Sequence, residues 1–211
     1  MSIEELFGLK GSVALVTGAA KWLGWDAACI LSEAGASVIV TSRDASKASE
    51  TAARLHEEYG GETLGLVMDQ CRYEDVKACM EEAFRWKGRL DILVNNAGGG
   101  SGKSPGHILK RDPKDEESMI RTNLLGPLWC AKEAARWMTE QKRGVIISIA
   151  SIAGLVGRDR RMYDRSNMKG QPVDYAASKS GIIGMTRDLA AMLAPYGIRV
   201  NSISPGGFEK P

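Results

Sequence analysis

Short apolar runs alternate with amphipathic stretches along this chain. The apolar runs, rich in β-branched residues, predict buried strands over Val13–Thr17, Ser37–Ser42, Thr63–Met68, Ile92–Asn95, Val145–Ser148 and Ile198–Ile203. Between them, apolar residues recur at helical spacing. This predicts helices over Trp22–Glu33, Ala45–Glu58, Tyr73–Trp86 and Pro172–Ala194, with a long helical stretch over Lys114–Gln141 whose main body follows Met119. A glycine-rich loop, Gly98 to Gly106, follows the fourth strand.

The alternation of strands and helices predicts the fold class. Strands separated by helices of this length form a parallel sheet with helices on both faces. We therefore expect a single α/β domain over residues 1–211, a Rossmann-type doubly wound sheet without linkers or internal repeats. In such a sheet the ligand binds in the crevice at the carboxyl ends of the strands.

Composition and charge narrow the classes of partner. The chain has 211 residues, of which 44% are hydrophobic and 26% charged, as in an ordinary globular domain. Its net charge of +2 is spread along the chain, so we expect neither nucleic acid nor a membrane surface as a partner. No apolar run reaches the roughly 18 residues needed to cross a bilayer, and the first residues carry acids, which favours a cytoplasmic protein.

Cysteines and histidines suggest no metal chemistry. The cysteines form no C-x-x-C pair and no zinc spacing, and His56 and His107 are far apart in the sequence. We expect no metal site and no Ser-His-Asp triad. The cysteines should pack as small apolar residues at positions 29, 71, 79 and 130.

Tyr175 and Lys179 carry the most informative candidate chemistry. Four residues apart on a predicted helix, their side chains share one face. An ammonium group beside a phenol lowers the pKa of the phenol, and such a tyrosine can exchange a proton near neutral pH. Considered alone, a lysine such as Lys179 is most often a solvated base.

A glycine turn joins the first strand to the first helix, from Thr17 to Gly24. Glycines at this place let the backbone turn tightly and approach a pyrophosphate at the helix N-terminus. The setting predicts dinucleotide binding, although many strand-to-helix connections need a glycine for geometry alone.

Together these features resemble the short-chain dehydrogenase/reductase family over essentially the whole chain, in particular its gluconate 5-dehydrogenase-like and 3-ketoacyl reductase-like members. The family's motifs match, in order, at Thr17, Gly18 and Gly24, at Asn95-Asn96-Ala97-Gly98, at Asn123, at Ser151, at Tyr175 with Lys179, and at Pro205-Gly206. Trp22 stands where the middle glycine of the first motif is expected.

The resemblance implies reversible oxidation of an alcohol to a carbonyl with NAD or NADP. The implied catalytic residues are Tyr175 as proton donor and acceptor, Ser151 as hydrogen-bond donor to the substrate oxygen, Lys179 as the tyrosine's cation, and Asn123 on a water-linked proton path. The implied cofactor-binding residues are Gly18, Lys21, Leu23, Gly24, Ser42, Arg43, Asp69, Asn96, Ala97, Gly98, Tyr175, Lys179, Pro205 and Gly206. The structural alternatives are a cap or turn at Ser151 and a helix kink or surface polar residue at Asn123.

The end of the second strand indicates the coenzyme. An acid there would bind the ribose 2′-hydroxyl of NAD, but the strand ends at Ser42, and Arg43 follows. A guanidinium suits a 2′-phosphate, and Lys21 could add a second cation, so we predict NADP, with NAD possible. The alternatives are a solvated Arg43 beside an Asp44 helix cap, while Asp69 either contacts adenine or caps the next helix.

Two segments depart from the family pattern. Ser151 and Tyr175 are 24 positions apart, about twice the family's usual gap. The extra segment, residues 157–171, is arginine-rich and is either a clamp for an anionic substrate or a surface loop or subunit contact. The sequence also ends soon after Pro205-Gly206, where family members continue to a seventh strand, and we expect a substrate-covering segment beyond this end.

The leading hypothesis is therefore an NADP(H)-dependent oxidoreductase acting on a small secondary alcohol or ketone, such as a sugar acid or ketoacyl compound. The alternative is a nucleotide-binding scaffold or sensor without turnover, which Trp22 favours. An epimerase or dehydratase on the same fold fits the short C-terminal region poorly. The resemblance also implies that helices within Met119–Gln141 and Pro172–Ala194 pair between subunits in a homodimer or homotetramer, unless they face only the chain's own sheet.

Overall fold

The computed structural model describes residues 6–99, 102–166 and 170–207. Its strands form one parallel sheet in the order β3-β2-β1-β4-β5-β6. They are β1 (Val13–Thr17), β2 (Ser37–Ser42), β3 (Thr63–Val67), β4 (Ile92–Asn95), β5 (Gly144–Ile149) and β6 (Ile198–Ile203). This is the predicted doubly wound α/β fold, and the strand order reverses between β1 and β4.

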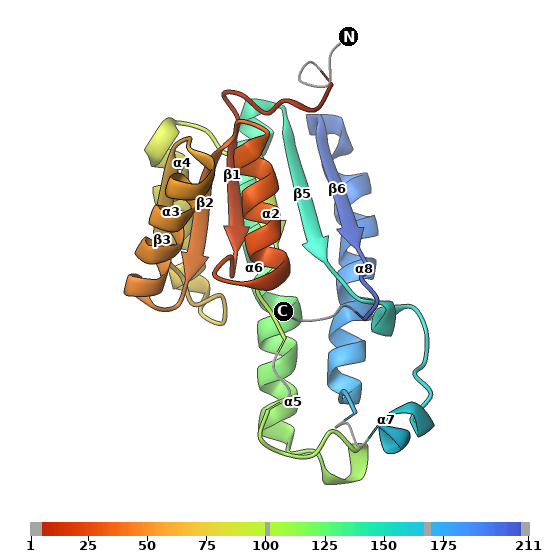
Figure 1. The fold of residues 1–211 in the computed structure, drawn as a ribbon. Helices are drawn as coiled ribbons and strands as arrows, with labels where there is room; N and C mark the ends of the chain where they lie inside the picture. Colours follow the sequence, from red (N-terminus) through yellow and green to blue (C-terminus); the bar gives the residue numbers. More distant parts are fainter. Residues whose placement is uncertain (1–5, 100–101, 167–169, 208–211) are drawn as a thin grey trace.

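Helices cover the two faces of the sheet (Figure 1). On one face lie α2 (Trp22–Glu33) and α3 (Ala45–Tyr59), and on the other lie α4 (Tyr73–Lys87), α6 (Gly126–Gln141) and α8 (Val173–Leu193). Each layer of helices closes its own apolar core. Every predicted strand and helix is present, although several boundaries differ by one or two residues.

The residues of β1 explain why its apolar run is continuous. Val13 and Leu15 pack in the core beneath α4, α6 and α8, whereas Ala14 and Val16 pack in the core beneath α2 and α3. Because successive side chains of a strand point to opposite faces, a strand that is buried on both faces must be apolar at every position.

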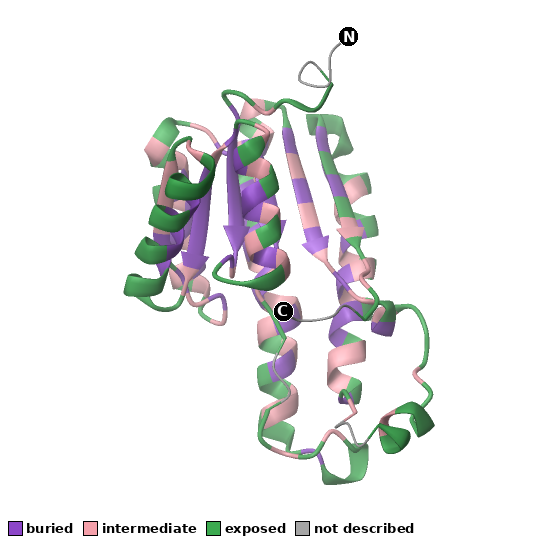
Figure 2. Cartoon of the chain, viewed as in Figure 1, coloured by how far each residue is buried: buried purple, intermediate pink, exposed green. Residues whose placement is uncertain are grey.

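The β5–β6 half of the sheet differs from the β1–β3 half. Along β6, Ile198 and Val200 are buried on the α8 side, while Arg199 and Asn201 are exposed. Among the residues that the structure describes, no helix covers this second face (Figure 2). Alternating buried and exposed positions therefore replace the continuous apolar pattern of β1.

The long predicted helical stretch is divided into three parts. It consists of α5 (Pro113–Ile120), the π-helix η2 (Arg121–Leu125) and α6 (Gly126–Gln141). In the π-helix the Gly126 N–H donates to the Arg121 carbonyl, five residues back. Pro127 has no N–H, so the Asn123 carbonyl loses the donor that a regular α-helix would give it.

Several short elements lie at the carboxyl edge of the sheet. They are η1 (Ile108–Lys110), η3 (Ile152–Gly154) and α7 (Arg161–Arg165), and η4 (Ala194–Tyr196) lies at the other end of α8. Helix α5 and the first half of α8 also extend beyond this edge (Figure 1). The extra segment 157–171 contains α7, which the sequence did not predict, and its residues 167–169 lie outside the described residues.

The cysteines mostly pack as predicted. Cys29, Cys79 and Cys130 are buried, whereas Cys71 is half-buried, and all four are free thiols. Burial raises the pKa of Cys79 to about 12 and raises that of Cys130 further, because the thiolate form loses its hydration. Within the described part of the chain, no helix combines the length and the apolar character that a membrane span requires.

Candidate active site

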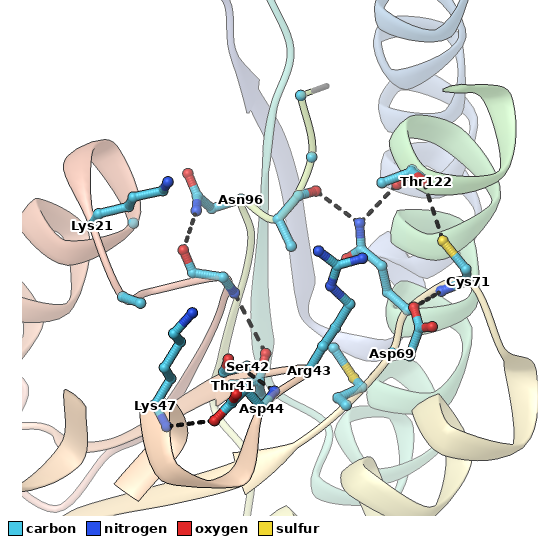
Figure 3. A pocket seen from close by; sticks show the side chains of 18 of the residues that line it. Lys21, Thr41, Ser42, Arg43, Asp44, Lys47, Asp69, Cys71, Asn96 and Thr122 are labelled. Carbon is cyan, nitrogen blue, oxygen red and sulfur yellow. Dashed lines mark hydrogen bonds between the residues drawn. The ribbon is translucent and has the colours of Figure 1, made fainter. Parts of the chain in front are cut away.

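The carboxyl ends of β1, β2, β3 and β4 surround a cavity of about 920 Å³. Its walls come from the loops after these strands, from α5 and from the π-helix. The cavity lies where the strand order reverses, as expected for the ligand crevice of a doubly wound sheet. Figure 3 shows its lining from close by.

Gly18 and Gly24 bring the start of α2 against the loop after β4. Gly18 has φ +64°, and a Cβ there would lie 2.9 Å from Ala97. A Cβ on Gly24 would lie 2.4 Å from the side-chain nitrogen of Asn96. The first turn of α2 has neither a side-chain cap nor an acidic residue, so this helix N-terminus suits an anion.

Four hydrogen bonds join the loop after β1 to the loop after β4. The Thr17 hydroxyl oxygen accepts from the N–H groups of Asn96 (3.0 Å) and Ala97 (2.9 Å). The Asn96 side-chain NH₂ donates to the carbonyls of Thr17 (3.0 Å) and Gly18 (3.1 Å), the latter drawn in Figure 3. The intact Asn-Asn-Ala-Gly motif thus holds the glycine turn in shape.

Trp22 has a left-handed backbone, with φ +54°. For an L-residue with a large side chain this conformation costs about 1–2 kcal/mol. At this position the short-chain dehydrogenase/reductase motif has a glycine. Trp22 therefore adopts a backbone conformation that suits glycine, and it is strained there. Its indole is 40% exposed and lines the cavity, with the Lys21 ammonium 4.1 Å from the ring centroid.

Three cations line the cavity, Arg43 and Lys47 after β2 and Lys21 after β1. In Figure 3 the side chains of Lys21, Arg43 and Lys47 extend into this space. The Asp44 carboxylate accepts from the Lys47 N–H (3.0 Å) and caps α3, as the structural alternative for Asp44 proposed. Lys47 was not predicted as a site residue. The sequence feature that could have indicated it is a base in the first turn of the helix that follows Arg43.

Asp69 follows β3 and also lines the cavity. Its carboxylate accepts from the Cys71 N–H (3.0 Å), while α4 begins at Tyr73 with Arg72 as its N-cap. The alternative that Asp69 caps the next helix is therefore wrong, because the carboxylate closes only the turn ahead of that helix. Its contact with adenine stays a prediction.

Gln70 is a buried cavity residue that the sequence did not single out. Its side-chain NH₂ donates to the carbonyls of Ala97 (2.9 Å) and Thr122 (2.7 Å). It thereby joins the loop after β4 to the π-helix, as Figure 3 shows at Thr122. No motif marks this glutamine, since its partners lie 27 and 52 positions away in the sequence.

Asn123 is buried in the π-helix, with 1% of its surface exposed. Its side-chain oxygen accepts from the Gly99 N–H (2.7 Å), and its NH₂ donates to the carbonyls of Gly99 (3.2 Å) and Met119 (3.1 Å). The helix is indeed irregular at this asparagine. The side chain also fixes the backbone directly after the Asn-Asn-Ala-Gly motif.

Lys179 and Tyr175 lie on one side of α8, beside the end of β5. The Lys179 ammonium donates to the Ile149 carbonyl (2.6 Å) and lies 5.8 Å from the centroid of the Tyr175 ring. Only 5% of Lys179 is exposed. Burial lowers the pKa of Lys179 from 10.5 to about 8, because the ammonium has lost most of its hydration.

Ser151 directly follows β5 and caps η3. Its hydroxyl oxygen accepts from the Ala153 N–H (3.2 Å), so the cap role given as its structural alternative is present. Next to it, the Ile152 N–H donates to the Pro205 carbonyl (3.1 Å). The Gly154 carbonyl accepts from the Ser180 hydroxyl (2.9 Å), which holds η3 against α8.

The predicted site residues fall into two groups. The residues predicted to bind the cofactor at the ends of β1 to β4 all line the cavity: Gly18, Lys21, Leu23, Gly24, Ser42, Arg43, Asp69, Asn96, Ala97 and Gly98. Ser151, Tyr175, Lys179, Pro205 and Gly206 are not among its lining residues and lie at the ends of β5 and β6 or on α8. Asn123 connects the groups, because it holds Gly99 while the next residue, Leu124, packs against Gly181 of α8.

Arginines of the extra segment bind the chain itself. The Arg160 guanidinium donates to the Gln171 carbonyl (2.7 Å), and Arg158 donates to the same carbonyl (3.3 Å). Arg161 pairs with Asp159 (2.7 Å). These contacts favour a structural role for the described part of the segment over a clamp for an anionic substrate.

Comparisons with known proteins agree with this geometry. A family model described as short chain dehydrogenase matches residues 12–211. A 3-oxoacyl-(acyl-carrier-protein) reductase of Aquifex aeolicus is 33% identical over 201 residues, which cover 95% of this chain and 75% of that protein. A short-chain type dehydrogenase/reductase structure from Mycobacterium marinum is 30% identical with a TM-score of 0.85, covering 97% of this chain and 76% of that one. A structure of NAD⁺-bound xylitol dehydrogenase is 30% identical with a TM-score of 0.85, and the match covers 96% of this chain and 73% of that one.

Proposed function

Because this chain belongs to the short chain dehydrogenase family and is thus an oxidoreductase, we propose that it interconverts a small secondary alcohol and its ketone with NADP(H). Tyr175 is the proton donor and acceptor in this proposal. The nicotinamide, when bound, supplies or accepts the hydride.

The environment of Lys179 is the observation that carries the proposal. The buried Lys179 ammonium lies 5.8 Å from the centroid of the Tyr175 ring, on the same side of α8, so one bound substrate and coenzyme can reach both groups. The Ile149 carbonyl fixes this ammonium at the end of β5, at the same edge of the sheet as the cavity. With a pKa of about 8, the lysine is mostly charged at neutral pH.

Ser151 and Asn123 support the proton transfer. The Ser151 oxygen accepts from the Ala153 N–H, which leaves its own hydrogen free to donate to a substrate oxygen. At Asn123, Pro127 removes the donor that a regular α-helix would give the backbone carbonyl, and we propose that this carbonyl accepts from a water on the proton path.

The cavity fits a dinucleotide. Tight glycine packing and the uncapped N-terminus of α2 suit a pyrophosphate, and the cations Lys21, Arg43 and Lys47 suit a ribose 2′-phosphate. We propose NADP on the strength of these three cations and of Ser42, which stands in place of an acid. NAD is the alternative coenzyme, because the xylitol dehydrogenase of similar fold binds NAD⁺.

The names of the relatives suggest the substrate class. A 3-oxoacyl group carries a ketone, and xylitol carries secondary alcohols. We propose a ketoacyl compound or a sugar acid as the substrate, both of which place a ketone or secondary alcohol near a polar group. We also propose a homodimer or homotetramer, supported by the exposed apolar residues Leu128 on α6 and Met192 on α8.

The experiment is a spectrophotometric screen of ketones and secondary alcohols, including acetoacetyl-CoA and gluconate, with NADPH/NADP and with NADH/NAD. Replacing Tyr175→Phe should lower kcat by about 100-fold or more, since it removes the acid-base group. Tyr196→Phe is the matched control, because this tyrosine is exposed at the far end of α8. Full activity of the Tyr175→Phe protein would refute the role of Tyr175.

Trp22 supports a second candidate, a nucleotide-binding scaffold or sensor without turnover. The Trp22 side chain lines the cavity at the glycine turn, on a backbone with left-handed φ. Tight NADPH binding with no turnover across the whole panel would favour this function over the oxidoreductase.

A further inference from the structure

Arg111 is a buried cation outside the predicted site. It lies between η1 and α5, and only 1% of its side chain is exposed. Its guanidinium pairs with the Asp174 carboxylate at 2.7 Å, and that side chain is 8% exposed. The two residues are 63 positions apart, so the pair joins two separate segments of the chain.

One of these segments forms a wall of the cavity. Arg111 also donates to the Ser104 carbonyl (3.3 Å) and lies 3.8 Å from the Asp115 carboxylate. This carboxylate accepts from the N–H groups of Lys103 (3.0 Å) and Ser104 (2.7 Å). Because Gly102 and Asp115 line the cavity, we call residues 102–104 with Asp115 the strap.

The other segment is the first turn of α8. Asp174 directly precedes Tyr175, and this end of α8 extends beyond the edge of the sheet (Figure 1). No side chain caps the helix at Pro172. The ion pair with Arg111 is therefore a direct tie between the strap and the helical turn that carries Tyr175.

A buried ion pair of this kind needs a reason beyond stability. Removing two charges from water is costly, and well-packed apolar residues in their place often leave a protein equally stable. An ion pair with a short, directed contact does, however, fix the relative position of the two segments that it joins.

We propose that Arg111 and Asp174 are positioning residues that couple the strap to Tyr175. A dinucleotide bound in the cavity restricts the motion of the strap. Because the ion pair joins the strap to the first turn of α8, that turn also becomes more rigid. The Tyr175 hydroxyl is then held in place for proton transfer. The kinetic part of this inference rests on the proposed function of Tyr175, whereas the physical coupling does not.

Kinetics with a paired variant separate positioning from folding. Asp174→Asn alone removes the carboxylate that lies 2.7 Å from the buried guanidinium, leaving Asp115 at 3.8 Å as its carboxylate neighbour, and should lower Tm. The double variant Arg111→Met/Asp174→Asn removes both charges and should recover most of that Tm. We expect its kcat to stay about tenfold or more below wild type, while the Kd of NADPH changes by less than about threefold. Asp188→Asn, exposed on the same helix, is the control and should change neither. Recovery of kcat together with Tm in the double variant would overturn the proposal.

Hydrogen exchange tests the coupling without turnover. In the wild type, 2′,5′-ADP, the half of NADP that lacks the nicotinamide ribose expected to contact Tyr175 and Lys179, should slow amide exchange both in residues 102–112 and in residues 173–180. In the double variant only the first segment should respond. Protection of 173–180 that persists in the double variant, or no protection of 102–112 in the wild type, overturns the proposal. Full activity of Tyr175→Phe would instead refute the proposed function and leave this exchange result standing.

Discussion

At the scale of single residues, Trp22 shows how backbone conformation and side-chain identity can disagree. Its φ of +54° belongs to the left-handed region that glycine adopts freely. The neighbouring turn cannot relax easily, because Gly24 is packed against Asn96 and Gly18. The rigid surroundings impose the strain on the residue.

This strain predicts an unusual order of stability. Trp22→Gly should be more stable than Trp22→Ala by about 1 kcal/mol, since both lose the indole but only alanine keeps the left-handed penalty. At Glu50, exposed within α3, glycine should instead be less stable than alanine by about 1 kcal/mol. Urea unfolding of the four variants measures both differences. Equal stabilities of the two Trp22 variants would contradict the assignment of strain.

Lys179 predicts a dependence of stability on pH. Its folded-state pKa of about 8 lies below the ordinary 10.5, because burial disfavours the ammonium. Between these values the unfolded chain binds the proton while the folded chain has released it, so stability rises with pH. Below about pH 8 both states are protonated and the folded state bears the full desolvation cost.

The free energy of unfolding of the wild type, relative to Lys179→Met, should therefore rise by about 3 kcal/mol between pH 7.5 and 10.5. Chemical unfolding of both proteins across this range measures the difference. Parallel curves for the two proteins would show that the buried lysine has an ordinary pKa.

At the scale of elements, the π-helix sets the direction of the Asn123 side chain. The widened turn places one amide side chain on both the N–H and the carbonyl of Gly99. A regular helix through Arg121–Leu125 would shift this side chain around the helix axis, away from the loop.

Replacing Asn123→Ala should lower the free energy of unfolding by about 1–3 kcal/mol, because the Gly99 backbone groups lose buried partners. Asn123→Asp should keep the acceptor for the Gly99 N–H but place a carboxylate against the Gly99 carbonyl. Amide exchange at Gly99 should therefore accelerate more in the alanine than in the aspartate variant. Asn201→Ala, exposed on β6, is the control. An unchanged Gly99 exchange rate in Asn123→Ala would contradict this account.

Elements were largely predictable because their signals are local. The apolar runs, the helical periods and the glycine turns lie within a few residues of one another, and all were found. The π-helix was missed because its amphipathic period resembles that of a helix, and only Gly126-Pro127 marks the break. Short α7 was missed because a polar surface segment has no apolar period.

Site residues divide in the same way. Those in motifs, such as Gly18 and Asn96, were predicted and do line the cavity. Gln70 and Lys47 were missed, because their places depend on partners or on a cavity formed by distant parts of the chain, and the Arg111–Asp174 contact was missed for the same reason. Contacts between residues far apart in a single sequence leave no local pattern from which they could be predicted.

At the scale of the whole molecule, charge is distributed unevenly although the net charge is only +2. Lys21, Arg43 and Lys47 surround one end of the cavity. These three bases outnumber the exposed Asp44 beside them, and an excess of one sign attracts an anionic ligand group, an attraction that salt weakens.

The cluster predicts a coenzyme preference that can be removed. Arg43→Gln should weaken NADPH binding by about 10- to 100-fold, while NADH binding changes by less than about threefold, because only NADPH carries the 2′-phosphate. Lys47→Gln should act in the same direction. Arg72→Gln removes a similarly exposed base near the start of α4 and is the control. Fluorescence titrations at two salt concentrations measure the ratio, and equal losses for both coenzymes would contradict the proposed 2′-phosphate site.

The joining of the two loops by Thr17 and Asn96 has a consequence for binding kinetics. Since the cavity floor is already ordered before a ligand arrives, association has little conformational entropy to lose there. The bimolecular rate should then be set by diffusion and orientation, with a weak temperature dependence, and differences in affinity among nucleotides should emerge in their residence times.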